Sequence, residues 1–344
     1  QSLHSMTFGI AVSLSNAKLP RILPDYFRES FRQNDPKSVK IVLTIFGLYR
    51  VLPYEGKLDL STITDNTPSF IPDIFYEFVK DFLKLFPLKL SFSFSPILLS
   101  SRGAMRYPIK GKNTSFFVLE AINALADWKV GKSSLLEYCG DILKHYPIDS
   151  IYSDWQHFLR KLNWSRHNFS VKPEVHPQAL GRLSLKEEPG KVRVFAIVDV
   201  FTQWVLRPLH LSIFKWLRPM STDATFNQDL GLHRFFKRVQ GRPVYSYDLS
   251  AATDRLPAVL QQKLVDFISP GLGLAWSRLL IGRPYWIKSK LHKVEESVYY
   301  SVGQPMGAYS SWGLLALSHH LVIQYCFYQV YGVKRWYKDY CVSG

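Results

Sequence analysis

Hydrophobic side chains recur at helical spacing after Pro72. They stand at i, i+3, i+4, i+7, i+8 and i+11, which predicts an amphipathic helix that Pro87 ends. Acidic and basic residues occupy its other faces, so we interpret the apolar positions as core rather than as a surface that stacks bases. They are Phe75, Phe78, Val79, Phe82, Leu83 and Phe86.

From Trp155 onward the sequence predicts a series of helices and hairpins. Apolar runs, period-two segments and Pro-Gly turns give five further elements. They are a basic helix over 155–166, a hairpin over 183–198, a helix over 202–216 with Pro208 near a kink, a hairpin over 283–300, and a helix over 308–331. Helices and antiparallel strands together indicate an α+β fold.

The last of these helices lies in a stretch without formal charge, Val298 to Val333. Such a stretch raises the question of a membrane span, but its serines, histidines and glutamines make it too polar for lipid. We therefore expect a core helix, with His319 and His320 as hydrogen-bonded core or interface groups rather than metal ligands.

Residues 244–255 contain two acidic residues that are candidates for the active site. They predict a strand ending at Asp248, a tight turn, and the start of a helix near Asp254 that continues through 257–268. Both carboxylates are then expected at the carboxyl edge of a sheet, where they suit Mg²⁺ and a nucleotide substrate. The alternative is structural: Asp254 caps the helix and Asp248 is a turn residue.

Cations and glycines offer a second set of candidates. Lys191 and Arg193 alternate on one strand of the 183–198 hairpin, and with Lys186 across the turn they could hold a triphosphate. Solvent-facing charges on a structural hairpin are the alternative. A glycine-framed loop precedes the last helix, where Ser310 and Ser311 could donate to sugar or phosphate oxygens. Its residues are Gly303, Gln304, Pro305, Met306 and Gly307.

The composition and net charge of the chain indicate what kind of partner it binds. The 344 residues carry 43 Lys and Arg against 27 Asp and Glu, a net charge of +16, which favours nucleic acid over a membrane surface, with solubility as the alternative. Basic and aromatic residues in the loop 99–115 form a candidate RNA or DNA contact, with a solvated loop as the equal alternative. The three cysteines have no zinc-site spacing and favour a reducing compartment. Because the chain begins with Gln1, we expect a fragment or processed product.

The order of these parts resembles the consecutive motifs of mitovirus RNA-dependent RNA polymerases. KEEPGKVRVFAIVD (186–199), YDLSAATDRLP (247–257) and GQPMGAYSSWGLLALSHH (303–320) carry the resemblance, and a weaker likeness runs upstream through Asn34 to Thr64. The family implies a right-hand polymerase with N-terminal, fingers-associated residues 1–170, fingers 171–240 and partial palm 241–344, without the thumb.

The resemblance also implies roles for single residues. Asp248 matches the metal-binding acid, Asp254 the acid that contacts the ribose, and Lys186, Lys191 and Arg193 the cations over the triphosphate. Gly303 to Ser311 match the loop and helix that hold template and sugar. The implied cofactor is Mg²⁺ or Mn²⁺, the partners are RNA and nucleoside triphosphates, and the implied compartment is the mitochondrion.

The sequence departs from the family pattern at Gly344. Mitovirus polymerases follow the strand that ends there with two adjacent aspartates, so the metal is expected to bind weakly or not at all and the fragment to be inactive alone. A non-catalytic RNA-binding remnant is one alternative. A reverse transcriptase is another, although the small and polar residues Ser250 to Asp254 suit a site that accepts the ribose 2′-hydroxyl.

Overall fold

The computed structural model describes residues 23–33, 35–48, 51, 56–67, 70–87, 135–146, 153–157, 160, 181–189 and 191–343. These residues fall into two compact units: one contains the described residues up to 57 together with 187–193, and the other contains the described parts of 58–186 and 194–344. The basic loop 99–115, Asn34, Arg50 and Gly344 lie outside the described residues.

The smaller unit contains helices α1 (Asp25–Arg32) and α2 (Pro36–Gly47) and the tip of a hairpin. Asp35 begins α2, since its carboxylate accepts hydrogen bonds from the backbone N–H groups of Lys37 and Ser38, both at 3.1 Å. Pro36 follows at the first helical position, where its missing N–H costs nothing.

Four strands form one sheet in the order β2-β1-β3-β4. The two predicted hairpins supply them: β1 (Arg182–Glu188) with β2 (Lys191–Ile197), and β3 (Tyr285–Ser289) with β4 (Val294–Val298). β3 joins the hairpins by pairing parallel to β1 and antiparallel to β4. A mixed sheet beside helices confirms the predicted α+β class.

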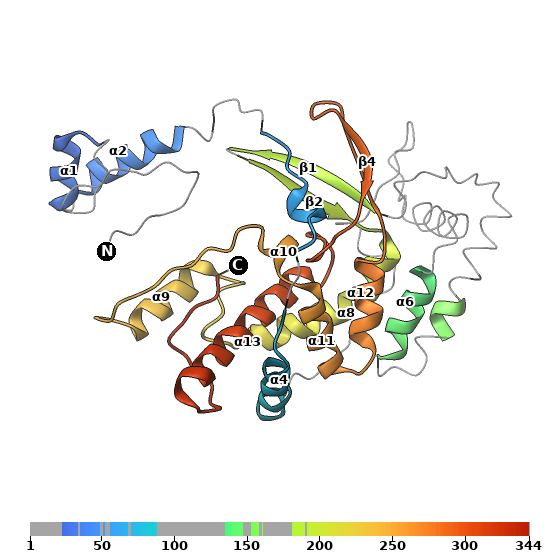
Figure 1. The fold of residues 1–344 in the computed structure, drawn as a ribbon. Helices are drawn as coiled ribbons and strands as arrows, with labels where there is room; N and C mark the ends of the chain where they lie inside the picture. Colours follow the sequence, from blue (N-terminus) through green and yellow to red (C-terminus); the bar gives the residue numbers. More distant parts are fainter. Residues whose placement is uncertain are drawn as a thin grey trace. The chain divides into compact units, whose positions relative to one another are not determined.

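The larger unit contains the described helices from α3 onward. They are α3 (Ser61–Thr64), α4 (Asp73–Leu85), α6 (Leu135–Lys144), α8 (Val200–Leu217), α9 (Gln228–Arg238), α10 (Ala252–Arg255), α11 (Ala258–Ile268), α12 (Leu272–Leu280) and α13 (Ser311–Tyr331). Of these, α6, α8, α11, α12 and α13 lie below β3 and β4 in the view of Figure 1. α12 packs against α11, α6 and α8, and α13 packs against α8, α11 and α4. One hydrophobic cluster runs through these contacts.

The predicted helices 72–86, 202–216 and 308–331 are confirmed as α4, α8 and α13. The phenylalanines of α4 are core residues, as expected: Phe78 stacks on Tyr328 of α13 with ring centroids 5.2 Å apart, and Phe75 meets Tyr325 edge to face. Pro208 lies inside α8, which continues past it. Of the predicted helix 155–166, only residues 155–157 and 160 are described, and they are helical.

None of the described helices is both long and apolar enough to cross a membrane. The interpretation of α13 as a core helix is supported by its buried side chains, among them Leu314, Leu317 and Leu321.

The strand predicted to end at Asp248 is not formed. Residues 243–249 run without helix or ladder pairing, and Tyr245 and Tyr247 are 79% and 87% exposed. Alternating β-formers make a strand only where a neighbouring strand accepts and donates their backbone hydrogen bonds. Among the described residues no strand pairs with this segment, so its alternating sequence does not form a strand.

Candidate nucleotide site around Asp248 and Asp254

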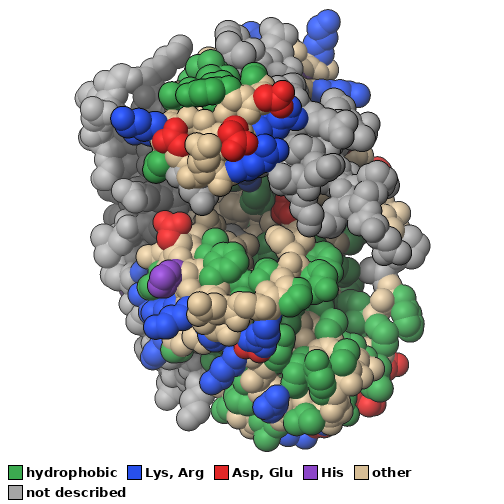
Figure 2. Space-filling model, turned by 90° about the vertical axis from the view of Figure 1, so that its left-hand side faces the viewer, with side chains coloured by type: hydrophobic (Ala, Val, Ile, Leu, Met, Phe, Trp, Pro, Cys, Tyr) green, Lys and Arg blue, Asp and Glu red, His purple; other side chains and the backbone are tan. Residues whose placement is uncertain are grey.

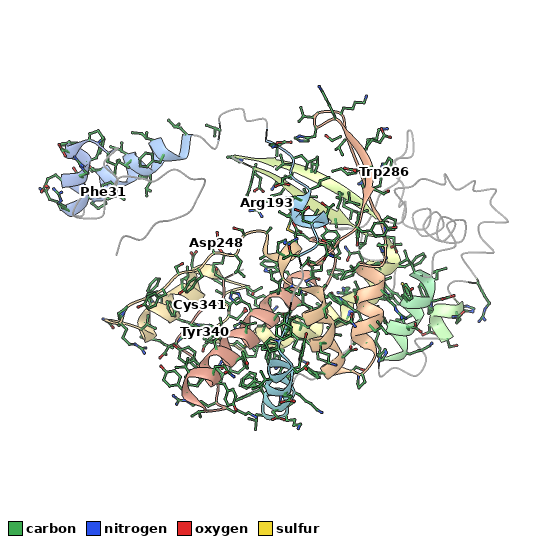
Figure 3. The ribbon with its side chains drawn as sticks, viewed as in Figure 1. Phe31, Arg193, Asp248, Trp286, Tyr340 and Cys341 are labelled. Atoms are coloured by element: carbon green, nitrogen blue, oxygen red, sulfur yellow. The ribbon has the colours of Figure 1, made fainter. Side chains whose placement is uncertain are left out.

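Asp248 lies exposed on the segment between α9 and α10 (Figure 3), and it belongs to none of the four strands. The expected position at the carboxyl edge of a sheet is therefore wrong for the described structure, because the strand that would carry it there has no partner. After Asp248 the chain turns at Ala251, which adopts the left-handed conformation with φ of 48°. Its carbonyl oxygen accepts from the Asp254 N–H at 3.0 Å and so starts α10.

Asp254 is half-buried and has a specific partner. The Thr62 hydroxyl of α3 donates to the Asp254 Oδ2 atom at 2.9 Å, across 192 residues of sequence. Burial raises the pKa of the Asp254 carboxyl, whereas the hydrogen bond from Thr62 and the Arg255 charge lower it. The carboxylate is thus partly desolvated and held by one donor, and it does not act as a side-chain helix cap.

The glycine-framed loop packs directly on the turn that contains Asp254. The Gln304 N–H donates to the Thr253 carbonyl oxygen at 3.0 Å. A Cβ atom at Gly303 would stand 2.3 Å from the carbonyl carbon and oxygen of Asp254, so only glycine allows this approach. Gly303 therefore allows the backbone of the acidic turn to lie directly against the loop.

The other end of the loop is tied to β2. The Ala196 N–H donates to the Met306 carbonyl oxygen at 2.7 Å. Gly307 has a φ of 115°, and a Cβ there would lie 2.6 Å from the Ala196 carbonyl oxygen. Pro305 is buried between these two attachments, which fix the loop relative to the sheet.

The polar side chains that follow are directed inward. The Gln304 amide donates to the Ser311 carbonyl oxygen at 2.9 Å and to the Gln261 side chain at 2.5 Å. Ser310 is buried, and its hydroxyl oxygen accepts from the Trp276 indole at 2.9 Å. Ser311 is also buried. In this conformation the Ser310 hydroxyl serves the core, while its contact with a sugar or phosphate stays a prediction.

The three hairpin cations are exposed. Lys186 belongs to the larger unit, whereas Lys191 and Arg193 belong to the smaller one. The Arg193 guanidinium forms an ion pair with Glu188 on the opposite strand. Binding of a triphosphate by Arg193 would have to compete with this pair.

The structure contains two sets of contacts that were not predicted from the sequence. One involves the segment 58–67, marked only by the weaker likeness, which supplies Thr62. The other is a buried network in which His320 Nε2 lies 3.0 Å from Asp223 Oδ2 and His320 Nδ1 lies 2.7 Å from the Tyr340 hydroxyl. This confirms His320 as a hydrogen-bonded core group. No periodicity pairs residues so far apart in sequence, so no local signal could have identified either contact.

The same network fixes the segment before Gly344. The Ala224 N–H donates to the Val342 carbonyl oxygen at 2.8 Å, and the Val342 N–H donates to Thr222 at 2.9 Å. The short strand predicted to end at Gly344 is therefore a single bridge between Asp223 and Val342 among the described residues.

Within the described part of the chain, no three His, Cys, Asp or Glu side chains gather closely enough to hold a metal ion. Asp248 could supply one exposed carboxylate ligand, which is an incomplete set for Mg²⁺ unless water or phosphate completes it. Lys and Arg side chains are scattered among exposed hydrophobic ones on the face in Figure 2. Among the described residues drawn on that face, the Lys and Arg side chains are therefore distributed rather than gathered into one patch.

The family described as mitovirus RNA-dependent RNA polymerase matches residues 100–344. An RNA-directed RNA polymerase of Cryphonectria parasitica mitovirus 1 is 28% identical over 97% of this chain and 41% of its own length. Two uncharacterized mitochondrial proteins of Arabidopsis thaliana are 34% and 33% identical over 37% of this chain, and over 51% and 62% of their own lengths. This chain thus spans about two fifths to three fifths of these relatives. No solved structure matches it.

Proposed function

We propose, from the premise that this chain belongs to the mitovirus RNA-dependent RNA polymerase family, that it carries the nucleotide-binding part of an RNA-directed RNA polymerase. The observation that carries the proposal is the family match, which spans all three motifs. In this proposal residues 241–344 form part of the palm, 171–240 belong to the fingers, and 1–170 are an associated N-terminal region.

The proposed reaction is template-directed nucleotidyl transfer. The 3′-oxygen of the growing RNA attacks the α-phosphorus of a nucleoside triphosphate, the bond to the bridging oxygen breaks, and pyrophosphate leaves. Divalent metal ions, when bound, would stabilise the attacking and leaving oxygens. Asp248 would hold one metal ion, Asp254 would accept from the ribose, and Lys186, Lys191 and Arg193 would neutralise the triphosphate.

The Asp254 turn supports a role in holding the sugar. Gly303 locks the loop 303–307 onto that turn, so the acid and the loop that would hold template and sugar form one rigid arrangement. We propose, as the family pattern implies, that two adjacent aspartates of the full-length polymerase complete the metal site with Asp248. The mitochondrion is the proposed compartment, in line with the names of the relatives.

The test is RNA-templated incorporation of labelled nucleotide with Mg²⁺ or Mn²⁺. It compares the 344-residue chain with one extended through the implied Asp-Asp and palm, each also as Asp248→Ala. We expect incorporation only by the extended chain, with a loss of more than about 100-fold for Asp248→Ala, because an acid that binds a catalytic metal ion has no substitute. The control Asp229→Ala removes an exposed acid from the first turn of α9 and should keep activity.

Other outcomes separate the alternatives. Incorporation by the 344-residue chain itself would refute the need for further acids. RNA binding that weakens steeply with salt, without incorporation by either chain, would favour a non-catalytic RNA-binding remnant. Equal use of deoxynucleotides by an active protein would favour a reverse transcriptase.

A further inference from the structure

The segment Leu58–Thr67, which lies upstream of all three motifs, reaches the acidic turn. Its helix α3 contacts α10, and Thr62 is the α3 residue whose hydroxyl donates to the Asp254 carboxylate at 2.9 Å. This contact connects two parts of the sequence that share no motif. It also occupies one oxygen of the acid that the proposed function assigns to the ribose.

The backbone of this segment is held by contacts that do not use the Thr62 hydroxyl. The Arg255 guanidinium donates to the Asp65 carbonyl oxygen at 2.7 Å and also to the Thr67 hydroxyl. The Ser301 N–H and hydroxyl donate to the Ile63 carbonyl oxygen at 3.0 and 2.9 Å, and the Ile63 side chain is fully buried. The position of Thr62 is therefore fixed independently, and loss of its hydroxyl should leave the segment in place.

A fixed donor on one carboxylate oxygen has two chemical consequences. It favours the ionised form of a half-buried acid that burial alone would tend to protonate. It also restricts rotation of the carboxyl group, so the lone pairs that remain have a constant direction. An ionised, oriented carboxylate is the form that accepts a hydrogen bond from a sugar hydroxyl.

We propose that Thr62 is a positioning residue that orients Asp254 toward the ribose hydroxyl of the incoming nucleotide. The inference rests on the proposed function, because it takes Asp254 as the acid that contacts the ribose. Thr62 acts only through Asp254 and need not contact the substrate. Selection of ribonucleotides then depends on a residue nearly two hundred positions before the acid it orients.

The test measures KM and kcat for a ribonucleotide and for its 2′-deoxy analogue with the extended chain. Thr62→Val removes the hydroxyl at nearly constant volume, whereas Thr62→Ser keeps it. Thr64→Val is the matched control, since the Thr64 hydroxyl is exposed and donates within its own segment to Leu60. The thermal midpoint of each variant is measured in parallel.

For Thr62→Val we expect the ribonucleotide KM to rise about tenfold, with a smaller change in kcat and an equal loss of preference over the deoxy analogue. About tenfold is the lower end for loss of a hydrogen bond to a charged group. Thr62→Ser and Thr64→Val should behave like the unsubstituted protein, and all midpoints should agree closely. A purely structural role would lower the Thr62→Val midpoint without changing sugar preference.

The two proposals fail in different ways. An active protein whose sugar preference is the same in Thr62→Val and Thr64→Val overturns the role of Thr62 and leaves the polymerase function intact. If the unsubstituted extended chain incorporates no nucleotide, the proposed function itself fails, and the inference falls with it.

Discussion

Asp199 and Arg283 form a buried ion pair that should contribute strongly to stability. The Asp199 Oδ2 atom accepts from Arg283 Nη1 at 2.8 Å, and both side chains are 1% exposed. The Oδ1 atom accepts from the N–H groups of Phe201 and Thr202, both at 2.9 Å, and so begins α8. One carboxylate therefore both caps the central helix and neutralises a cation in the core.

Asp199→Asn removes the negative charge but keeps the helix cap. Asparagine caps helices about as well as aspartate, so the two N–H groups keep their acceptor. Arg283 loses its counter-ion inside the core, which typically costs about 3–5 kcal/mol. Against a total stability of roughly 5–15 kcal/mol for a domain, a loss of this size would be large.

Urea unfolding followed by circular dichroism measures the effect. The midpoint should fall while the slope stays the same, because the surface exposed on unfolding is unchanged. Asp339→Asn is the matched control, because the ion pair of Asp339 with Arg242 has the same length of 2.8 Å. The Arg242 and Asp339 side chains are 52% and 34% exposed, respectively, so the loss of stability should stay below about 1 kcal/mol. Equal losses in the two variants would refute the reasoning, as would an additive further loss when Arg283→Met is combined with Asp199→Asn.

Two more predictions concern the surroundings of the loop 303–307. Burial lowers the pKa of His210 to about 4, and its Nδ1 atom accepts from the Ser310 N–H at 3.2 Å, so the folded state favours the neutral ring. The stability from this neutral ring is complete above pH 6.5, the usual pKa of histidine, and is lost as the pH falls toward about 4. His210→Gln keeps an acceptor but does not titrate, so its free energy of unfolding should depend less steeply on pH in that window. An unchanged dependence on pH would contradict this. Gly303→Ala should cost about 1–3 kcal/mol, measured as a lower thermal midpoint, because the backbone of Asp254 must move. Gly47→Ala, where a Cβ meets nothing within 4 Å, should cost much less, and equal costs would argue against the close approach at Gly303.

Elements with a strong local signal could be predicted from the sequence. The period of the α4 phenylalanines, the alternation along β1 and β2 and the uncharged run of α13 each depend on neighbours within one or two turns of chain, and these helices and strands are confirmed. The family could be named as well, because its motifs are contiguous in sequence.

Features that depend on distant partners could not be predicted. Arg283 is the first residue of the predicted hairpin 283–300, yet it is buried against Asp199. Val244 to Asp248 has the alternation of a strand, but pairing is decided by a neighbouring strand and not by the segment itself. Among the site residues, the sequence indicated Asp254 but not Thr62, because a single hydroxyl 192 positions away leaves no pattern.

The contacts of residues 61–67 also bear on how the protein is made. Their partners Asp254, Arg255 and Ser301 lie 188 to 238 residues later in the chain. At about 5–20 residues per second, a ribosome would release this segment roughly 10–50 s before those partners exist. Throughout that interval the hydrogen bonds from Arg255 and Ser301 that hold this segment would be missing. Docking of this segment should be among the last steps of folding, and a chaperone would have its longest opportunity to act there.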